Sequence, residues 1–296
     1  MTQIEPISVR GPALRFETLF DGETTSAGEG LELHPDFAAV YGGPLRLQPP
    51  VKGLPLLAAN FVASHDGRVA FNHPDHRGGG PISGFNDNDV WLMGLLRARA
   101  DAVVVGEGTI RAEPSHVNTP DDIYPDDKDA FAALRRHENR SELPIISYIT
   151  LDGNLPPEAK VFSMEDAHVV VATTRAGARR IRAAVRSDGR IDLLEFGSSG
   201  VNLERYARIM AEDYGVEFLL CEGGATLYGA FLEAGIMNEP FITRSPLVVG
   251  ENPGNPRPSL VEGTGWLPDD TPRMKILSVR KAGDYLYMRY RATYPA

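Results

Sequence analysis

The chain has 296 residues, of which 42% are hydrophobic and 24% are charged, and its formal net charge is −10. This length suffices for one large α/β domain or two small ones, and a core of that size needs no disulfide or metal to stabilise it. The negative charge argues against general binding to nucleic acid or to an acidic membrane, because no net positive field would gather polyanions.

Two further features bear on the compartment of the protein. Cys221 is the single cysteine, which excludes an intrachain disulfide and an all-cysteine zinc site. No apolar run is long enough to cross a membrane, and the first residues contain no apolar core of signal-peptide length. We therefore expect a cytoplasmic protein that is neither exported nor membrane-spanning.

The first part of the chain differs in composition from the rest. Residues 1–50 are rich in glycine, proline and acidic residues, with only short apolar pieces such as 14–20 and 37–41. This composition predicts an irregular N-terminal arm that packs onto a body. The body is predicted to span residues 51–296 as one domain.

In the body, apolar runs typical of buried strands alternate with stretches of helical spacing. The predicted strands are 56–63, 102–106, 144–150, 168–173, 191–196, 216–221 and 239–249, and the predicted helices are 86–99, 176–186, 202–214 and 225–234. This alternation indicates an α/β fold with a mostly parallel sheet covered on both faces. In the tail, 273–279 and 285–290 flank a turn, which predicts an antiparallel hairpin and hence a mixed sheet.

A polar, acidic stretch at 114–142 interrupts this alternation, with a short helical piece near 129–136. It is predicted to be a long surface excursion. The sequence leaves two roles open for it, a solvated loop or a flap that faces the substrate.

The most informative turn, Glu222-Gly223-Gly224, follows a predicted strand and opens a predicted helix. Its glycines let a ligand approach the backbone, and the helix N-terminus offers unpaired N–H groups. This arrangement favours a phosphate as ligand, although a tight strand-to-helix turn also needs such glycines when no ligand binds.

A second turn of this kind, Gly106-Glu107-Gly108-Thr109, follows the predicted strand 102–106. Its glycines again permit close approach, and the hydroxyl of Thr109 can bond a phosphate oxygen. Two such turns fit the pyrophosphate of a dinucleotide better than one. The pattern is not the Rossmann fingerprint, because Arg111 stands where the last glycine would be.

The first predicted strand of the body leads into a polar turn that contains Asp66 and Gly67. An aspartate beside a glycine is common turn chemistry, and it is also a way to place a carboxylate at the mouth of a pocket. The sequence leaves both roles open.

Two segments with metal-binding side chains do not predict a metal site. His73 and His76 fall short of the three protein ligands of a catalytic zinc. The run 86–89 (NDND) lacks the glycine and glutamate of a calcium loop, and together with Ser83 it is better explained as the opening of a helix.

An ordered set of motifs resembles one known family. The set is 60–70 (NFVASHDGRVA), 82–83 (IS), 96–113 (LRARADAVVVGEGTIRAE), 222–227 (EGGATL) and 247–250 (LVVG). In order and spacing it is similar to the reductase domain of riboflavin-biosynthesis deaminase-reductases and to stand-alone pyrimidine reductases, which have the dihydrofolate-reductase-like fold. The resemblance covers about residues 50–292.

The resemblance implies an NADPH-dependent reductase that acts on a phosphoribosylamino-pyrimidine, similar to 5-amino-6-(5-phosphoribosylamino)uracil. Hydride would pass to C1′ of the opened ribose. It also implies a homodimer, closed two-fold assemblies being the commonest oligomers. By this resemblance and the glycine turns, the cofactor would be held by Gly106, Thr109, Gly223, Gly224, Ala225, Thr226 and Leu227, and the substrate by Asn60, Ser83, Arg97 and Glu222.

Reduction of an imine carbon also needs a proton, which a carboxyl group with a raised pKa can supply. Glu113 falls where the family places an aspartate between cofactor and substrate, and it is the first candidate. Asp66, which matches the aspartate of the family's Ser-x-Asp-Gly turn, is the second. Their alternative roles are those of a helix-start residue and a turn residue.

Selection of NADPH requires a cation or hydroxyl groups for the 2′-phosphate. Thr174 and Arg175 follow the predicted strand 168–173, where the fold would place that phosphate, and Thr150 is a further candidate. Thr174 can instead cap the helix that follows.

The chain departs from the family in two respects. After Glu113 it continues Pro-Ser-His-Val-Asn-Thr119, and the arginine with which bifunctional members bind the substrate's phosphate has no counterpart. The deaminase half is also missing, since its zinc site needs more than one cysteine. Two alternatives therefore stay open, reduction of a pterin or dihydrofolate-like heterocycle, and nucleotide binding without catalysis.

Overall fold

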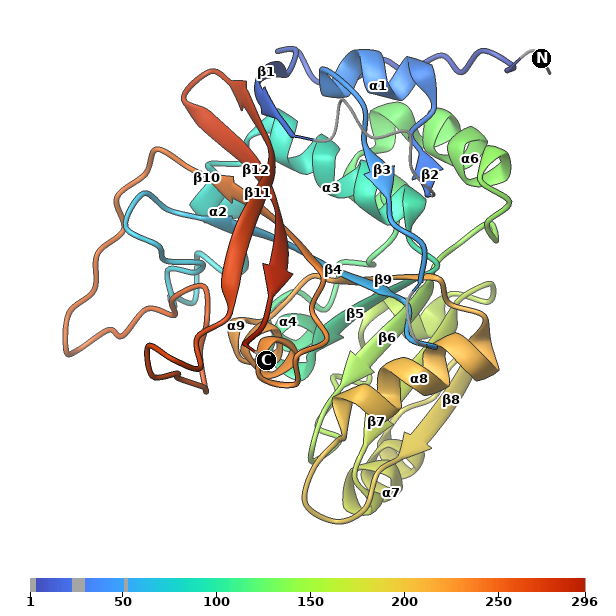
Figure 1. Cartoon of the computed structure of the whole chain (residues 1–296). Helices are drawn as coiled ribbons and strands as arrows, with labels where there is room; N and C mark the ends of the chain where they lie inside the picture. Colours follow the sequence, from blue (N-terminus) through green and yellow to red (C-terminus); the bar gives the residue numbers. More distant parts are fainter. Residues whose placement is uncertain (1–3, 23–29, 51–52, 296) are drawn as a thin grey trace.

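The computed structural model describes residues 4–22, 30–50 and 53–295, and within them a ten-stranded mixed sheet forms the centre of the fold (Figure 1). The strands from β10 to β8 are parallel, and an antiparallel part continues the sheet on one side. The spatial order is β1 (Glu17–Asp21), β11 (Arg273–Ala282), β12 (Tyr285–Thr293), β10 (Glu239–Arg244), β4 (Leu56–Ala63), β9 (Phe218–Cys221), β5 (Ala102–Gly106), β6 (Ile145–Ile149), β7 (His168–Thr173) and β8 (Arg190–Glu195).

The predicted α/β class is confirmed, and every predicted strand of the body is present. The bounds of β4, β5 and β7 are those predicted, because strands inside a parallel sheet are covered on both faces and appear as continuous apolar runs. The predicted strand 239–249 ends earlier, at Arg244, where the chain leaves the sheet. The tail hairpin is confirmed as β11 and β12, each of which is longer than predicted.

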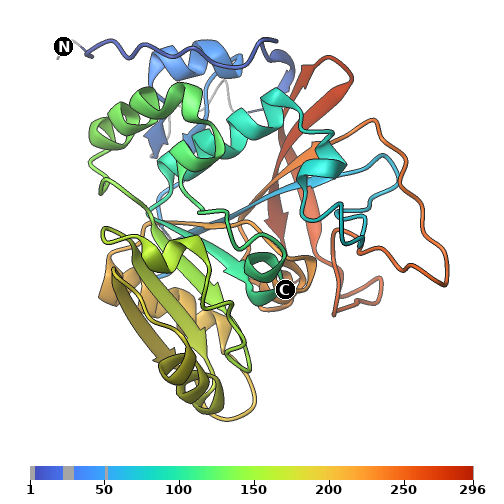
Figure 2. The same ribbon diagram turned by 180° about the vertical axis from the view of Figure 1, so that it is seen from behind.

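Helices cover both faces of the sheet, as Figures 1 and 2 show from opposite sides. The predicted helices are confirmed as α3, α7, α8 and α9. One face carries α1 (Pro35–Tyr41), α3 (Asp87–Arg99), α6 (Lys128–His137) and α7 (Arg175–Ala184), and the other carries α8 (Leu203–Tyr214) and α9 (Ala225–Glu233). The connections contain α2 (Gly80–Ser83), α4 (Glu107–Ala112), α5 (Pro120–Ile123) and two 3-10 turns, Pro125–Asp127 and Lys160–Ser163.

The polar stretch 114–142 is more ordered than a solvated loop. It contains α5 and α6, and α6 packs Phe131 and Leu134 into the core beside Trp91 of α3. Asp127 accepts a hydrogen bond from the indole nitrogen of Trp91 at 2.9 Å. Much of this stretch therefore belongs to the body, and only its first part lies beside the site described below.

The N-terminal arm packs onto the body as predicted, but it is less irregular than predicted. β1 adds to the edge strand β11, and β2 (Leu31–Glu32) pairs with β3 (Arg46–Leu47). Phe16, Phe37 and Tyr41 enter the same hydrophobic core as Trp91. The apolar side chains of the arm therefore extend the core of the body, which its glycine- and proline-rich composition concealed.

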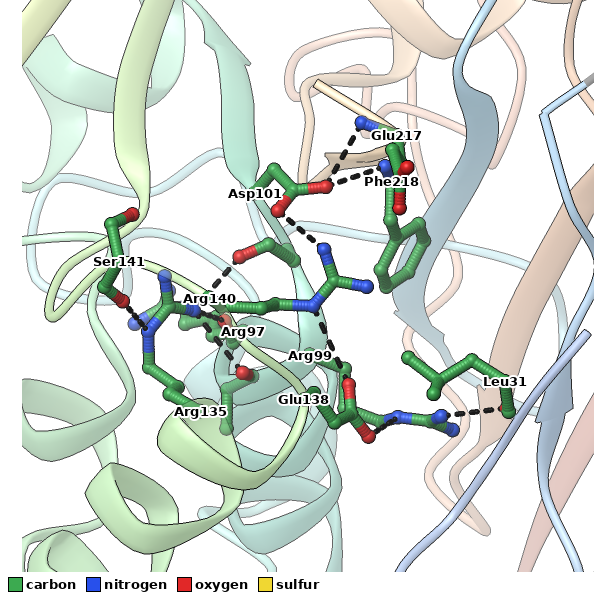
Figure 3. A network of polar contacts seen from close by, with 12 residues as sticks. Leu31, Arg97, Arg99, Asp101, Arg135, Glu138, Arg140, Ser141, Glu217 and Phe218 are labelled. Atoms are coloured by element: carbon green, nitrogen blue, oxygen red, sulfur yellow. Dashed lines mark hydrogen bonds and ion pairs between the residues drawn. The ribbon is translucent and has the colours of Figure 1, made fainter. Parts of the chain in front are cut away.

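A buried polar network joins α3, α6 and the arm (Figure 3). Arg99 pairs with Glu138 at 2.8 Å, and its other nitrogens donate to the carbonyl oxygens of Leu31 and Leu45. At the end of α3, Arg135 donates to the carbonyl oxygens of Arg97, Ala98 and Ala100. In the described part of the chain, no helix is long and apolar enough to span a membrane.

Candidate active site

The two glycine turns predicted from the sequence meet at the carboxyl ends of β9 and β5. The N–H of Gly106 donates to the carbonyl oxygen of Gly223 at 2.7 Å, and that of Glu222 donates to Val104 at 3.0 Å. A Cβ at Gly106 would lie 3.6 Å from the nitrogen of Gly224. The turns therefore form one continuous backbone surface, from which α4 and α9 both begin.

Neither helix has a side chain that caps its N-terminus. The N-cap residues are Gly106 for α4 and Gly224 for α9, and no side chain accepts from their first N–H groups. Gly223 has a φ of 119°, which strongly favours glycine, and its bond to Gly224 is cis. The hydroxyl of Thr109 lies 3.4 Å from the position that a Cβ of Gly223 would take. The surface thus offers free N–H donors and a hydroxyl to an anion.

Four of the other residues predicted to bind the cofactor lie in two places, the first turn of α9 and the end of β6. Ala225 and Leu227 are buried in the first turn of α9, while Thr226 is exposed there. Thr150 donates to Glu107 and accepts from the N–H of Gly153, so its hydroxyl already has partners.

Thr174, which follows β7, has the helix-capping role that the sequence left open as the alternative to phosphate binding. Its hydroxyl accepts from Gly177 N at 3.1 Å and donates to Leu151 O at 2.7 Å, which caps α7. Arg175 is exposed in the first turn of this helix. Of the residues predicted for a 2′-phosphate, Arg175 is thus the one with a side chain available to it.

Arg97 and Glu222, both predicted to face the substrate, form a buried ion pair. Nε and Nη2 of Arg97 each lie 2.9 Å from Oε2 of Glu222, and Nε also lies 3.1 Å from Oε1. Its Nη1 donates to the carbonyl oxygens of Val117 and Thr119. Asn118 donates to Glu222 at 3.4 Å. The pair therefore fastens segment 117–119 over the carboxyl end of β9.

Asn60 and Ser83 lie on the same side of the sheet as this pair. Along β4, Ala58 packs against the core under α3 and Val62 packs against Ile82 of α2, so Asn60 between them faces α2 and α3. Ser83 is buried and donates to the carbonyl oxygen of Gly80. The structure thus brings the four predicted substrate residues to one polar seat, which we define as Asn60, Ser83, Asp89, Arg97, Glu222 and Thr243.

Asp89 of this seat was not predicted from the sequence as a site residue. It lies in the first turn of α3, where the side chain of Asn86 accepts from its N–H. Burial raises the pKa of its carboxyl to about 6, and the charge of Glu222 adds to this, while the hydroxyls of Thr243 and Ser83 oppose it. A spacing of eight residues, which is about two helical turns, put Asp89 on the same face as Arg97 and could have indicated it.

Asp66 has the geometry of a turn residue. Its carboxylate accepts from Ser64 Oγ at 2.7 Å and from the N–H groups of Val249 and Gly250 at 2.9 and 2.7 Å. These hydrogen bonds, that of Val249 foremost, hold the pKa of Asp66 well below its usual range. A carboxylate in this state does not hold a proton near neutral pH, so the turn role is favoured over proton donation.

Glu113 ends α4 and is half-buried beside the loop that precedes α2. Its carboxylate stands within 2.6 Å of the position that a Cβ of Gly78 would take. His116 lies nearby, and its hydrogen bond to Asp122, at 2.9 Å, raises the pKa of its imidazole, to which the charge of Glu113 contributes. Glu113 therefore lies at the end of α4 opposite to the glycine turn, next to the loop before α2.

In the described residues, no group of three or more His, Cys, Asp or Glu side chains could hold a metal ion. His73 and His76 lie with their rings 5.4 Å apart in the loop before α2.

The sequence model of the RibD C-terminal domain matches residues 55–287. The chain belongs to this family. It is 28% identical over 220 residues to the 2,5-diamino-6-ribosylamino-4(3H)-pyrimidinone 5′-phosphate reductase of Methanothermobacter thermautotrophicus, across 71% of this chain and 85% of that protein. It is also 28% identical over 201 residues to the riboflavin biosynthesis protein RibD of Chlamydia trachomatis, across 68% of this chain.

The chain spans about half the length of that RibD protein, 48%. A crystal structure of a pyrimidine reductase-like protein from Corynebacterium diphtheriae superposes on it with a TM-score of 0.62 at 21% identity, and the match covers 81% of this chain and 92% of that one. The two proteins therefore share a fold over most of their length.

Proposed function

We propose that this chain is an NADPH-dependent reductase of a ribosylaminopyrimidine phosphate in riboflavin biosynthesis. The observation that carries the proposal is the position of two uncapped glycine turns directly beside the polar seat. The turns accept a pyrophosphate through backbone N–H groups, and the substrate-facing residues start at Glu222, the residue before Gly223. The family and the names of its relatives support the same reaction.

The fit of the dinucleotide depends on glycine at two positions. A side chain at Gly106 or Gly223 would occupy the space beside Gly224 N and Thr109 Oγ1, where the phosphates would lie. When bound, NADPH supplies the hydride. Arg175, exposed at the start of α7, is our candidate for its 2′-phosphate.

The chain itself would align the substrate and provide the proton. The pair Arg97–Glu222 holds segment 117–119, which narrows the site above the glycine turns. As the hydride adds to C1′ of the carbon–nitrogen double bond, a proton must reach the nitrogen, and we assign its delivery to Glu113. Asp66 would order the loop at 247–250 instead. We also propose that the protein acts as a homodimer in the cytoplasm.

Two measurements test the proposal. Fluorescence titration with NADPH and NADH shows whether the cofactor site exists, and failure of both to bind would reject it. Oxidation of NADPH is then followed with 5-amino-6-(5-phosphoribosylamino)uracil, with its 2-amino counterpart and with dihydrofolate. Turnover of dihydrofolate alone would replace the riboflavin assignment, and cofactor binding without any turnover would favour a nucleotide-binding protein.

A further inference from the structure

The polar seat is rich in hydrogen-bond acceptors that the fold leaves available. The side-chain oxygen of Asn60 is buried and has no hydrogen-bond partner among the described residues. Asp89 is 4% exposed and Asn60 is 6% exposed, so each is more than nine-tenths buried. An orphaned acceptor at this depth is costly unless a ligand or water completes it.

The two acceptors come from elements that are distant in the sequence but packed on each other, β4 in the sheet and α3 above it. Thr243 of β10 stands opposite Val62 of β4, one step along the same face from Asn60. The hydroxyls of Thr243 and Ser83 act on the carboxyl of Asp89. Asn60 and Asp89 therefore both lie between α3 and the sheet.

The only cation of the seat is committed elsewhere. Arg97 directs its guanidinium to Glu222 and to the carbonyl oxygens of Val117 and Thr119. The hydroxyl of Ser83 donates to the carbonyl oxygen of Gly80. The groups left for a ligand are the carboxylate of Asp89, the side-chain amide of Asn60 and the hydroxyl of Thr243, whose oxygen also has no hydrogen-bond partner among the described residues. The carboxylate can only accept, so a ligand engages it best by presenting N–H donors.

We propose that Asp89 and Asn60 accept hydrogen bonds from the N3–H and 2-amino edge of the substrate's base, and so select a 2-amino-4-pyrimidinone over a uracil. This inference rests on the proposed function. A planar edge with two adjacent donors matches a carboxylate in bidentate fashion, and Asn60 takes the remaining hydrogen of the amino group.

A uracil ring fits this arrangement poorly. At position 2 it carries a carbonyl oxygen, which would face the carboxylate of Asp89 and leave one of its oxygens unpaired. A site built to accept from a substrate N–H group discriminates strongly against an analogue that lacks the donor. Asp89 thus acts as a specificity residue, whereas Glu222 acts by holding segment 117–119.

Binding of the free bases tests the inference without requiring turnover. Isothermal titration calorimetry of the full chain at pH 7.5 compares 2,5,6-triamino-4-pyrimidinone with 5,6-diaminouracil. We expect the triamino base to bind at least about tenfold more tightly. Asp89→Asn should reverse this preference, because its amide nitrogen donates to the 2-carbonyl oxygen while its oxygen still accepts from N3–H.

Two further variants show whether the preference for the triamino base depends on Asn60 and on Asp89 in particular. Asn60→Ala should weaken binding of the triamino base about tenfold and change the uracil base little. Asp87→Asn is the matched control, since it alters the same charge in the same helical turn but its side chain accepts from Ala13 of the arm. This control should keep the preference of the unaltered chain.

Equal binding of both bases, binding of neither, or an Asp89→Asn variant that loses both equally would overturn the inference. Steady-state kinetics with the two ribosylated substrates separates it from the proposed function. A preserved preference among the bases without any turnover would reject the reaction and leave the specificity of the seat standing. Turnover of both substrates at equal kcat/KM would leave the reaction standing and reject the specificity.

Discussion

Glu222 shows how one turn residue connects two parts of the site. Its carboxylate accepts hydrogen bonds from Nε and Nη2 of Arg97 and from the side-chain amide of Asn118. Both members of the ion pair are buried, so the pair contributes little net stability but is costly to break. The main effect of the pair is on geometry. Glu222, which begins the glycine turn, also fixes segment 117–119 over the seat through Arg97.

Glu113 provides a first testable prediction about a single residue. Glu113→Gln keeps the shape of the side chain and removes its acidity, so kcat should fall about a hundredfold or more if this group delivers the proton. Its NADPH affinity, measured by fluorescence titration, should stay nearly unchanged. Glu158→Gln, an exposed carboxyl far along the chain, serves as the control. An unaltered rate would remove Glu113 from the mechanism.

Asp89 provides a second prediction, which concerns pH. Its pKa in the folded protein, about 6, lies above the 3.8 of an ordinary aspartate, so folding favours the protonated form. The contribution of this carboxyl to stability is therefore greatest below about pH 4 and is lost as the pH rises through 6. The negative charge of Glu222 further disfavours ionisation of Asp89. Tyr285 and Tyr287 also face the carboxyl group of Asp89.

Asp89→Asn should remove this pH dependence. At pH 8 we expect the variant to exceed the unaltered chain in free energy of unfolding by up to about 3 kcal/mol, and at pH 4.5 by only about 1 kcal/mol. Urea denaturation at both pH values measures the difference. A variant that is less stable at pH 8 would show that the carboxylate is a structural anchor.

At the scale of elements, the cradle depends on two helices that begin at one place. α4 and α9 start from neighbouring parallel strands, so their N-termini lie side by side and their partial positive charges add. The strands set this arrangement, because the carboxyl ends of parallel strands share one edge of the sheet. The helix α7 begins at the same edge, two strands further along.

Gly223→Ala tests the cradle. The new Cβ would stand 3.4 Å from the hydroxyl of Thr109, on a backbone with a φ of 119°. We expect affinity for NADPH to fall at least about tenfold. Gly235→Ala is the matched control, because Gly235 follows the other end of the same helix with a φ of 70° and open space around it. Equal loss in both variants would indicate general destabilisation.

At the scale of the whole molecule, the arm and the body form one core. Arg99, fully buried, bridges Glu138 of the body to backbone carbonyl oxygens of the arm, and burial lowers the pKa of its guanidinium. The neighbouring Asp101 binds the N–H groups of Glu217 and Phe218 at the start of β9 (Figure 3). The same network thus attaches the arm and sets the strand that leads to Glu222.

Arg99→Leu should loosen this attachment. Removing Arg99 leaves the buried carboxylate of Glu138 with the longer contact to Arg140, at 3.4 Å, so the free energy of unfolding should drop by about 3 kcal/mol. Limited proteolysis should then cut the arm faster than the body. Arg208→Leu, which breaks an exposed i,i+4 pair with Glu204, should change stability by no more than about 0.5 kcal/mol. Similar effects of the two variants would contradict the role of the network.

Local sequence was enough to determine the strands of the body and the two glycine turns. Strands such as β4 and β5 are continuous apolar runs because both their faces are buried, and Gly223 is required by its own backbone conformation. The motifs in order indicated the family and the four substrate-facing residues. Composition misjudged the arm, because its few apolar residues enter a core that other segments complete.

Only the tertiary structure decided what the individual side chains do. Asp66 is a loop anchor because Val249 and Gly250, far along the chain, donate to it. Asp89 acquires its raised pKa because it is buried beside Glu222 and Thr243, which belong to segments far along the chain. Backbone requirements act between sequence neighbours and can be predicted from them, whereas the protonation and partners of a buried carboxyl depend on every segment packed around it.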